Sequence, residues 1–143
     1  MEINNKISVK FLSLSENESF ARSVVACFAL FYNPSLSEIS DIKTAVSEAV
    51  TNCIVHGYPD TVGEIEIESE ISGDELHINI FDKGVGIENV NEALEPFYTT
   101  KPDEERAGMG FTIMKSFMDD VKVESKKGEG TKIYMIKKLN ADS

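Results

Sequence analysis

The chain has 143 residues, 41% of them hydrophobic, so it is long enough to bury one core without disulfides or structural metals. Its formal net charge of −11 repels phosphate backbones and anionic membrane surfaces, which disfavours direct binding to nucleic acid or lipid. No apolar run approaches a membrane span and Cys27 and Cys53 lack metal-ligand spacing, so we expect a soluble cytoplasmic protein of one domain, residues 1–143, with two buried thiols.

The N-terminal part of the chain predicts a strand followed by a helix. Apolar and polar residues alternate over residues 7–11, which is typical of a half-buried strand. Ser15 and Glu18 have capping-box spacing, so a helix is expected to begin there. Arg22 falls on the side of this helix opposite the predicted apolar stripe. The stripe consists of Phe20, Val24, Phe28 and Phe31.

A second, longer helix carries a carboxylate and a carboxamide one turn apart. Ser35 and Glu38 form another capping-box pattern at its start, and residues 56–59 are expected to end it. Glu48 and Asn52 are four residues apart, so they project from the same side of the helix, mostly clear of its apolar stripe. The stripe consists of Ile39, Ile42, Val46, Ala49, Val50 and Cys53.

The pattern then changes to the period of two that indicates strands. Alternation over residues 65–71 and 76–80, separated by a turn at residues 72–74, predicts an antiparallel hairpin. A third main helix over residues 111–118 and two final strands, residues 121–125 and 131–136, follow. This order predicts an α+β two-layer sandwich with helices on one face of a mixed or antiparallel sheet.

Between these parts, residues 83–108 lack sustained periodicity, and only residues 90–94 look helical. A segment of this length is either disordered or a functional lid, and we place a nucleotide lid at about residues 95–108.

Glu48 and Asn52 have the chemistry of a metal and proton site. An amide oxygen can be the single protein ligand of a Mg²⁺ ion that keeps its waters and phosphates, which suits Asn52. A carboxylate one turn away can accept a proton as a general base, which suits Glu48. The alternative is a solvated polar pair on an exposed helix face, and the spacing alone does not exclude it.

Two residues are predicted to face the core at strand ends. Strand parity turns Asp82 inward, where its carboxylate needs a donor such as the exocyclic amine of adenine. Gly84 and Gly86 allow a tight turn and close approach of the backbone to a ligand. Parity points the Thr131 hydroxyl to the same face. The alternatives are an aspartate that caps a turn and a threonine that is bonded locally.

A second glycine pair precedes the third main helix. Gly108, Met109 and Gly110 would present free backbone N–H groups at a helix N-terminus, which favours a phosphate. Ahead of it, residues 98–106 supply hydroxyls and cations on the expected lid, although Lys101 and Arg106 would equally solubilise a loop. Neither glycine pair matches a P-loop or a Rossmann fingerprint.

Together these segments resemble the adenine-nucleotide fold shared by DNA gyrase, Hsp90, sensor histidine kinases and mismatch-repair ATPases, the Bergerat-type ATP-binding fold. Residues 48–52 resemble its N-box, and residues 82–86 and 108–110 its two glycine boxes. The chain is most similar to the anti-sigma-factor serine kinase branch. The similar segments are residues 15–22, 47–52, 56–58, 99–102 and 108–114.

The resemblance implies a homodimer that binds a sporulation sigma factor in its ATP state and phosphorylates a serine of a small anti-anti-sigma factor. It implies that Glu48 activates the serine hydroxyl, that Asn52 ligates Mg²⁺, and that Arg22 and Arg106 contact protein partners. The residues implied in ATP binding are Asn52, Asp82, Gly84, Gly86, Thr99, Lys101, Gly108, Met109, Gly110 and Thr131.

Three other functions remain open at this point. The chain could be a nucleotide-dependent sigma-binding module without catalysis, a catalytic domain of the sensor-histidine-kinase type, or an ATPase switch with no protein acceptor. The presence of both Glu48 and Asn52 argues against the first. Against the second, the chain has only two histidines, His56 and His77, and neither lies in a plausible phosphoacceptor helix.

Overall fold

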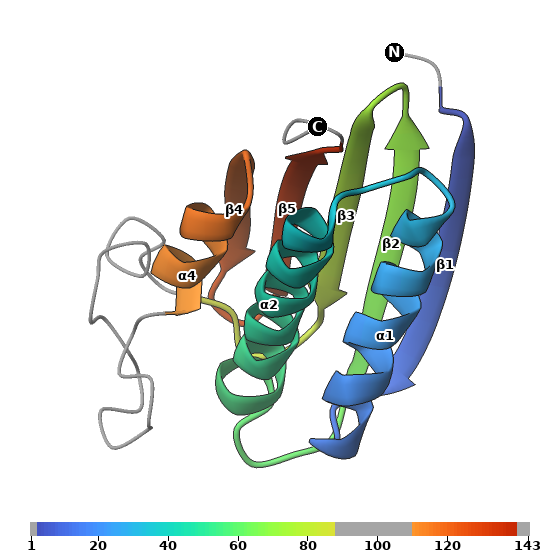
Figure 1. Ribbon diagram of the computed structural model, residues 1–143. Helices are drawn as coiled ribbons and strands as arrows, with labels where there is room; N and C mark the ends of the chain where they lie inside the picture. The colour runs from blue at the N-terminus through green and yellow to red at the C-terminus, as the bar shows by residue number, and fades with distance from the viewer. Residues whose placement is uncertain (1–2, 88–109, 140–143) are drawn as a thin grey trace.

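The computed structural model describes residues 3–87 and 110–139, in which one five-stranded sheet carries three α-helices on one face (Figure 1). The strand order is β1-β2-β3-β5-β4, and every neighbouring pair is antiparallel. This confirms the predicted two-layer α+β sandwich, with a sheet that is antiparallel throughout the described strands.

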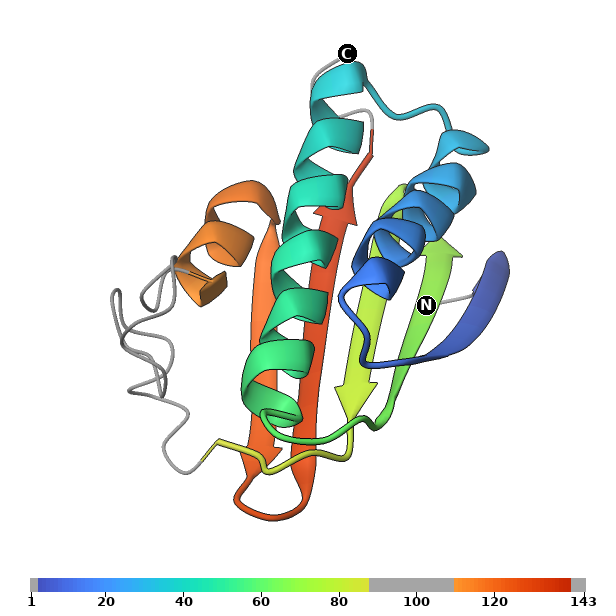
Figure 2. The same cartoon turned by 90° about the horizontal axis from the view of Figure 1, so that it is seen from below.

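The elements follow the predicted order closely. The strands are β1 (Asn5–Leu12), β2 (Glu64–Ser72), β3 (Glu75–Asp82), β4 (Asp120–Lys126) and β5 (Gly130–Lys138). The helices are α1 (Glu16–Leu30), α2 (Leu36–Asn52) and α4 (Gly110–Phe117), and a π-helical turn, η1 (Cys53–Gly57), continues from α2. Figure 2 shows α1, α2 and α4 lying along the same face of the sheet.

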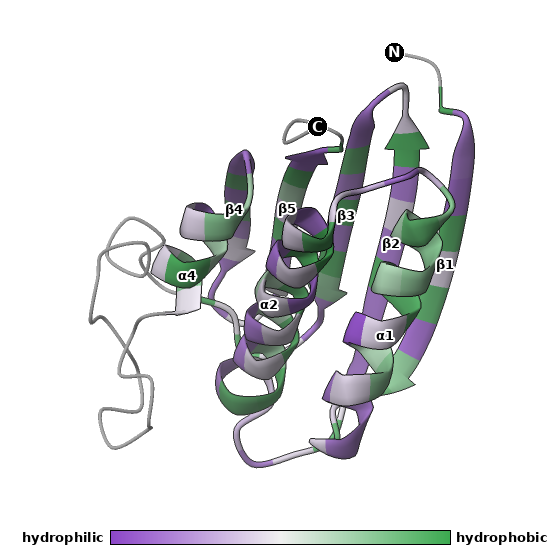
Figure 3. Ribbon diagram, viewed as in Figure 1, coloured by the Kyte–Doolittle hydropathy of each residue, from purple (hydrophilic) through white to green (hydrophobic). Residues whose placement is uncertain are grey.

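The core lies between the helices and the sheet, as strand parity predicted. The buried positions of β2 and β3 alternate with more exposed ones, and the hydropathy colouring in Figure 3 shows the same alternation. Residues that β2, β3 and β5 bury completely or nearly so are Ile65, Ile67, Ile71, Leu76, Ile78, Ile80, Ile133 and Met135. Across this layer, α2 buries Ile42, Ala45, Val46, Ala49 and Val50.

The predicted stripe of α1 was wrong. Phe20 and Phe31 are 56% and 82% exposed, and of the four predicted residues only Phe28 is buried. The buried face is shifted by about one residue and consists of Ala21, Val25, Ala26, Phe28 and Ala29. Small alanines allow α1 to approach its neighbours closely, whereas the periodicity alone favoured the larger side chains. Cys27, also predicted to be buried, lies on the exposed side of α1, while Cys53 is buried.

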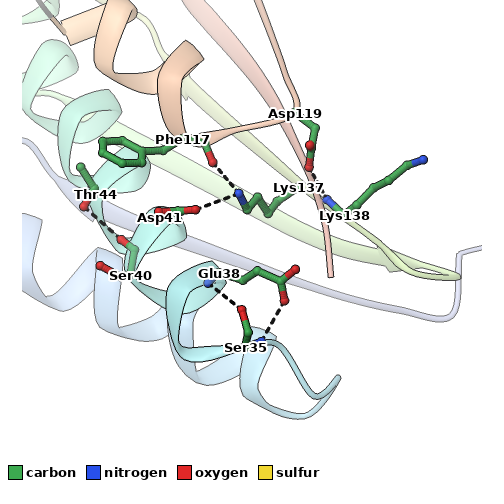
Figure 4. Close-up of polar contacts among 9 residues, drawn as sticks. All are labelled: Ser35, Glu38, Ser40, Asp41, Thr44, Phe117, Asp119, Lys137 and Lys138. Atoms are coloured by element: carbon green, nitrogen blue, oxygen red, sulfur yellow. Dashed lines mark hydrogen bonds and ion pairs between the residues drawn. The ribbon is translucent and has the colours of Figure 1, made fainter. Parts of the chain in front are cut away.

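Only one of the two capping boxes forms. At α2, Ser35 Oγ accepts from Glu38 N at 3.1 Å and Glu38 Oε1 accepts from Ser35 N at 2.8 Å (Figure 4). At α1, Ser15 is in the αR conformation and makes no side-chain cap bond. Glu18 instead accepts a hydrogen bond from Ser47 Oγ of α2. The capping box predicted at Ser15 and Glu18 was therefore wrong, because a tertiary partner engages the glutamate.

Several predictions fall on residues outside the described part of the chain. They are the short helix at residues 90–94 and the lid at about residues 95–108. That residues 1–143 form one domain also stays a prediction. None of the helices within residues 3–87 and 110–139 is both long and apolar enough to cross a membrane.

Candidate functional site

The carboxyl group of Asp82 lies at the end of β3 and is directed into the protein. The side chain is only 5% exposed, which confirms the predicted parity. Its Oδ1 atom accepts from Gly84 N at 2.9 Å and from Thr131 N at 3.2 Å. Among the described residues, Oδ2 has no hydrogen-bond partner of normal geometry. One oxygen is therefore held by backbone donors, and the other is a buried acceptor without such a donor among the described residues.

Burial raises the pKa of the Asp82 carboxyl, since desolvation disfavours its charged form. The N–H groups of Gly84 and Thr131 and the thiol of Cys53 oppose this by lowering the pKa. The thiol lies in η1, directly after Asn52, so the contact joins the end of α2 to the end of β3. Burial and the neighbouring Asp82 also raise the pKa of Cys53 well above its ordinary value, which keeps the thiol protonated.

Glycines allow three backbone segments to meet around this carboxyl. A Cβ atom on Gly84 would lie 2.0 Å from the carbonyl oxygen of Gly57, and one on Gly57 would lie 2.9 Å from Asp82 Oδ2. On the other side, a Cβ on Gly130 would lie 2.1 Å from the Asp82 carbonyl oxygen, and its φ is +94°. No larger residue fits these three positions without displacing backbone or the carboxylate.

Gly86 allows the chain to turn past the β4–β5 connection. Its φ is +75°, and a Cβ there would lie 2.1 Å from the carbonyl oxygen of Lys126. Gly84 and Gly86 approach protein backbone closely, and their close approach to a ligand stays a prediction.

The π-helical turn η1 directs Gly57 toward Asp82. Its closing bond runs from Tyr58 N to Cys53 O at 3.0 Å, five residues apart. The Tyr58 hydroxyl then donates to Glu64 O and accepts from Lys83 N, both at 2.7 Å. This arrangement fixes the backbone directly after Asp82, and π-turns of this kind are frequent at functional sites.

Thr131 is 3% exposed and pairs with Asp82 across the β3–β5 ladder. Its hydroxyl lies 2.8 Å from Ser125 Oγ, which in turn accepts from Ile87 N at 2.7 Å. The inward parity of Thr131 is confirmed, and its side chain is also bonded locally. Ser125 thereby links Thr131 to the segment that follows Gly86.

Glu48 lies on α2, next to the beginning of α4. Its side chain is 5% exposed, so the prediction that it lies mostly clear of the packed face was wrong. A Cβ atom on Gly110 would lie 3.8 Å from Glu48 Oε2, which shows that α4 begins directly over the carboxylate. Asn52, one turn further along α2, is half-buried.

Together these contacts bring five of the predicted site segments to one end of the sandwich. The end of α2 meets Asp82 through Cys53 of η1, Asp82 meets Thr131 and Gly84, and Gly110 meets Glu48. The predicted site residues Thr99, Lys101, Arg106, Gly108 and Met109 lie outside the described residues.

Arg22 lies elsewhere, on α1. Its side chain is 41% exposed, and its guanidinium lies 3.7 Å from Glu18 Oε1 and donates to Ser19 Oγ at 3.4 Å. Glu18 also accepts from Ser47, the neighbour of Glu48, so Arg22 is connected to α2 through one carboxylate. The described contacts of Arg22 are with residues of its own helix, and its role as a partner contact stays a prediction.

The sequence-based prediction missed Cys53, Gly57, Ser125 and Gly130 as parts of this site. The residues around Gly57 belong to a segment that carried the resemblance, so a signal for that glycine existed. For Gly130 the signal was its position next to Thr131. Nothing in the sequence indicated Cys53 or Ser125, because only the tertiary structure places their side chains beside Asp82 and Thr131.

Comparison with protein families and individual proteins identifies the family of the chain. The family profile of the histidine kinase-like ATPase domain matches residues 12–137. An anti-sigma F factor of Clostridium acetobutylicum is 58% identical over 137 residues, which cover 96% of each chain. An anti-sigma F factor of Thermoanaerobacter pseudethanolicus is 54% identical over 142 residues, which cover 99% of each chain.

Solved structures share the fold at low sequence identity. The RsbU and RsbW domains of a Mycobacterium tuberculosis protein superpose with a TM-score of 0.68 at 16% identity, over 95% of this chain and 32% of that one. The catalytic domain of the histidine kinase ThkA gives a TM-score of 0.59 at 16% identity over 97% of both chains. At these identities the likeness concerns the fold alone.

Proposed function

The chain belongs to the histidine kinase-like ATPase domain family and, within it, to the anti-sigma F factors, and on that premise we propose that it is both an anti-sigma factor and a protein serine kinase. It binds and inhibits a sporulation sigma factor, and it uses Mg-ATP to phosphorylate a serine of an anti-anti-sigma factor that competes for it. It acts in the cytoplasm as a homodimer.

The observation that carries the proposal is the Asp82 carboxyl with one oxygen held and one open. The N–H groups of Gly84 and Thr131 orient Oδ1, and Oδ2 is buried without a partner among the described residues. Such an acceptor fits the exocyclic amine of adenine, which supplies the missing donor. The glycine at position 57 keeps a side chain away from this acceptor, since a Cβ atom there would lie 2.9 Å from Oδ2.

The groups at the end of α2 fit the phosphate and metal end of the nucleotide. Asn52 would hold Mg²⁺ through its amide oxygen, a hard ligand on a half-buried side chain. Bound Mg-ATP supplies the phosphoryl group and the charge compensation that phosphoryl transfer requires. The backbone amides at Gly108, Met109 and Gly110, with Thr99 and Lys101 of the proposed lid, would hold the phosphates.

Glu48 is the proposed general base. It lies beneath the first residue of α4, where the helix dipole favours a negative charge, and it is shielded from bulk water. From this position its carboxylate can accept the proton of an incoming serine hydroxyl, a contribution of about 10²–10⁴-fold to the rate.

Arg22 and Arg106 are the proposed partner contacts. The Arg22 side chain is 41% exposed on α1, so this surface of the helix is accessible to a partner. The Glu18 carboxylate shared by Arg22 and Ser47 gives this surface a connection to α2.

The deciding experiment is phosphoryl transfer with purified components. The protein is incubated with Mg-ATP labelled at the γ-phosphate and with the anti-anti-sigma protein of the same genome. We expect acid-stable phosphoserine on the partner, and at least a hundredfold slower transfer with Glu48→Gln, as removal of a general base predicts. Glu16→Gln, on an exposed glutamate of α1, serves as the control and should match wild type.

Each alternative function gives a different result. A binding module without catalysis would retain the sigma factor in ATP but transfer no phosphate. A histidine-kinase-type domain would form acid-labile phosphohistidine, and an ATPase switch would release phosphate without an acceptor. Asn52→Ala should lose Mg²⁺-dependent ATP binding, and unchanged affinity would exclude its role as metal ligand.

A further inference from the structure

The Lys137 side chain of β5 contacts both the C-terminal end of α4 and the N-terminal part of α2. Lys137 Nζ donates to the carbonyl oxygen of Phe117 at 2.7 Å, and it lies 3.0 Å from Asp41 Oδ2 of α2 (Figure 4). One ammonium group therefore joins the last residue of α4, the second turn of α2 and the sheet.

This lysine is well placed for a strong interaction. Its side chain is 12% exposed and that of Asp41 22% exposed, so the pair is screened less than an ordinary surface ion pair. The ammonium also lies at a helix C-terminus, where free carbonyl groups and the helix dipole favour a cation.

The residues directly after α4 form further hydrogen bonds with β5. Asp119 N donates to Ile136 O at 2.9 Å, and Asp119 Oδ2 accepts from Lys138 N at 2.7 Å. Hydrogen bonds of Asp119 thus fix the chain directly after α4 to β5, and the Lys137 side chain adds a polar contact with α2.

The two helices run in opposite directions between two points of contact. Seven residues separate Asp41 from Glu48 on α2, and seven separate Gly110 from Phe117 on α4, so each interval is about 10.5 Å long. At one end Lys137 joins Asp41 to Phe117. At the other end Gly110 lies over Glu48, and a Cβ atom on this glycine would be 3.8 Å from Oε2.

We propose that Lys137 is a positioning residue of the nucleotide site, which sets the spacing between Glu48 and the beginning of α4 by joining the opposite ends of their two helices. The inference rests on the proposed function, in which Glu48 is the base and α4 begins at the phosphates. Because α4 is short and stiff, loss of the contact at Phe117 changes the position of Gly110. Misplacement by about 1 Å can lower a rate by roughly a hundredfold.

The test compares Lys137→Met, which keeps the aliphatic stem, with Lys138→Met as the matched control. Lys138 is exposed and contributes only its backbone N–H to the contacts at this end of α4. We expect Lys137→Met to lower kcat for the partner protein by at least about tenfold with an unchanged KM for that partner, and to weaken Mg-ATP binding. Lys137→Arg should restore part of kcat, since it keeps a cationic donor.

Asp41→Asn provides an independent variant of the same contact. It should lower kcat in the same direction, and the double variant with Lys137→Met should lose little more than the single ones, because both remove one interaction. All rates are measured well below the melting temperature of the least stable variant. A kcat for Lys137→Met within twofold of Lys138→Met, with only the melting temperature lowered, would overturn the proposal.

A measurement on the nucleotide-free protein separates this inference from the proposed function. The backbone amide resonances of Gly110 and Phe111 should shift in Lys137→Met and stay in place in Lys138→Met. Unchanged resonances would overturn the positioning role even if the wild type is an active kinase. If the wild type binds no Mg-ATP while those resonances do shift, the proposed function fails and the coupling between the two helix ends stands.

Discussion

At the scale of single residues, Asp82 contributes to the pH dependence of the stability of the nucleotide-free protein. Burial raises the pKa of its carboxyl above the ordinary value. A carboxyl whose pKa rises on folding binds its proton more tightly in the folded chain than in the unfolded one. Its contribution therefore makes the free energy of unfolding fall as the pH rises from the ordinary carboxyl pKa through the raised one.

Asp82→Asn should remove this contribution. We expect the variant to gain about 1 kcal/mol in free energy of unfolding at neutral pH, because it removes a buried charged oxygen that lacks a partner. The difference between the free energies of unfolding of the variant and the wild type should vanish toward low pH. Denaturant unfolding at several pH values measures both effects.

The same variant should lose its response to nucleotide. At a Mg-ATP concentration about 100 times Kd, the free energy of unfolding of the wild type should rise by roughly 2.7 kcal/mol. At the same concentration, that of Asp82→Asn should rise very little. The exposed Asp74→Asn is the control and should respond as wild type does. A full thermal shift in Asp82→Asn would show that adenine is recognised elsewhere.

At the scale of elements, identical sequence patterns form different local structures. Two Ser-x-x-Glu patterns precede helices, but only the pair Ser35 and Glu38 forms a capping box. Helix α1 carries apolar residues on two sides, so its periodicity did not identify the packed one. Strand parity was reliable because a sheet with one covered face leaves only two choices, and both Asp82 and Thr131 are buried as predicted.

The capping difference predicts a difference in stability. Ser35→Ala should lower the free energy of unfolding by about 1 kcal/mol, since it removes the acceptor for the Glu38 amide at the beginning of α2. Ser15→Ala is the matched control, because Ser15 makes no side-chain cap bond, and it should change stability by less than about 0.5 kcal/mol. Equal losses in the two variants, measured by urea unfolding, would contradict this explanation.

At the scale of the whole molecule, the net charge of −11 opposes the compact state. Four glutamates lie on the uncovered side of β2, and Lys6 offsets two of them, at 3.1 Å from Glu68 and 3.6 Å from Glu70. Most other carboxylates of the described residues are exposed or half-buried, where salt screens their charge.

Added salt should therefore stabilise the nucleotide-free protein. We expect the melting temperature at neutral pH to rise by several degrees between about 0.02 and 0.3 M NaCl, a range over which the Debye length falls below about 10 Å. Thermal unfolding followed by circular dichroism measures it, with an equimolar sucrose series as the control for effects other than screening. A fall with added salt would mean that attractive ion pairs outweigh the net repulsion.

The sequence by itself determined the two-layer fold, the order of the elements and the inward direction of Asp82 and Thr131, because hydrophobic periods of 2 and 3.6 residues report which side of each element is buried. Only the tertiary structure decided which polar groups meet. It placed Cys53 and Gly57 against Asp82, closed α4 over Glu48 and joined both helices through Lys137. These contacts depend on how elements distant in the chain are packed, and no local pattern carries that information.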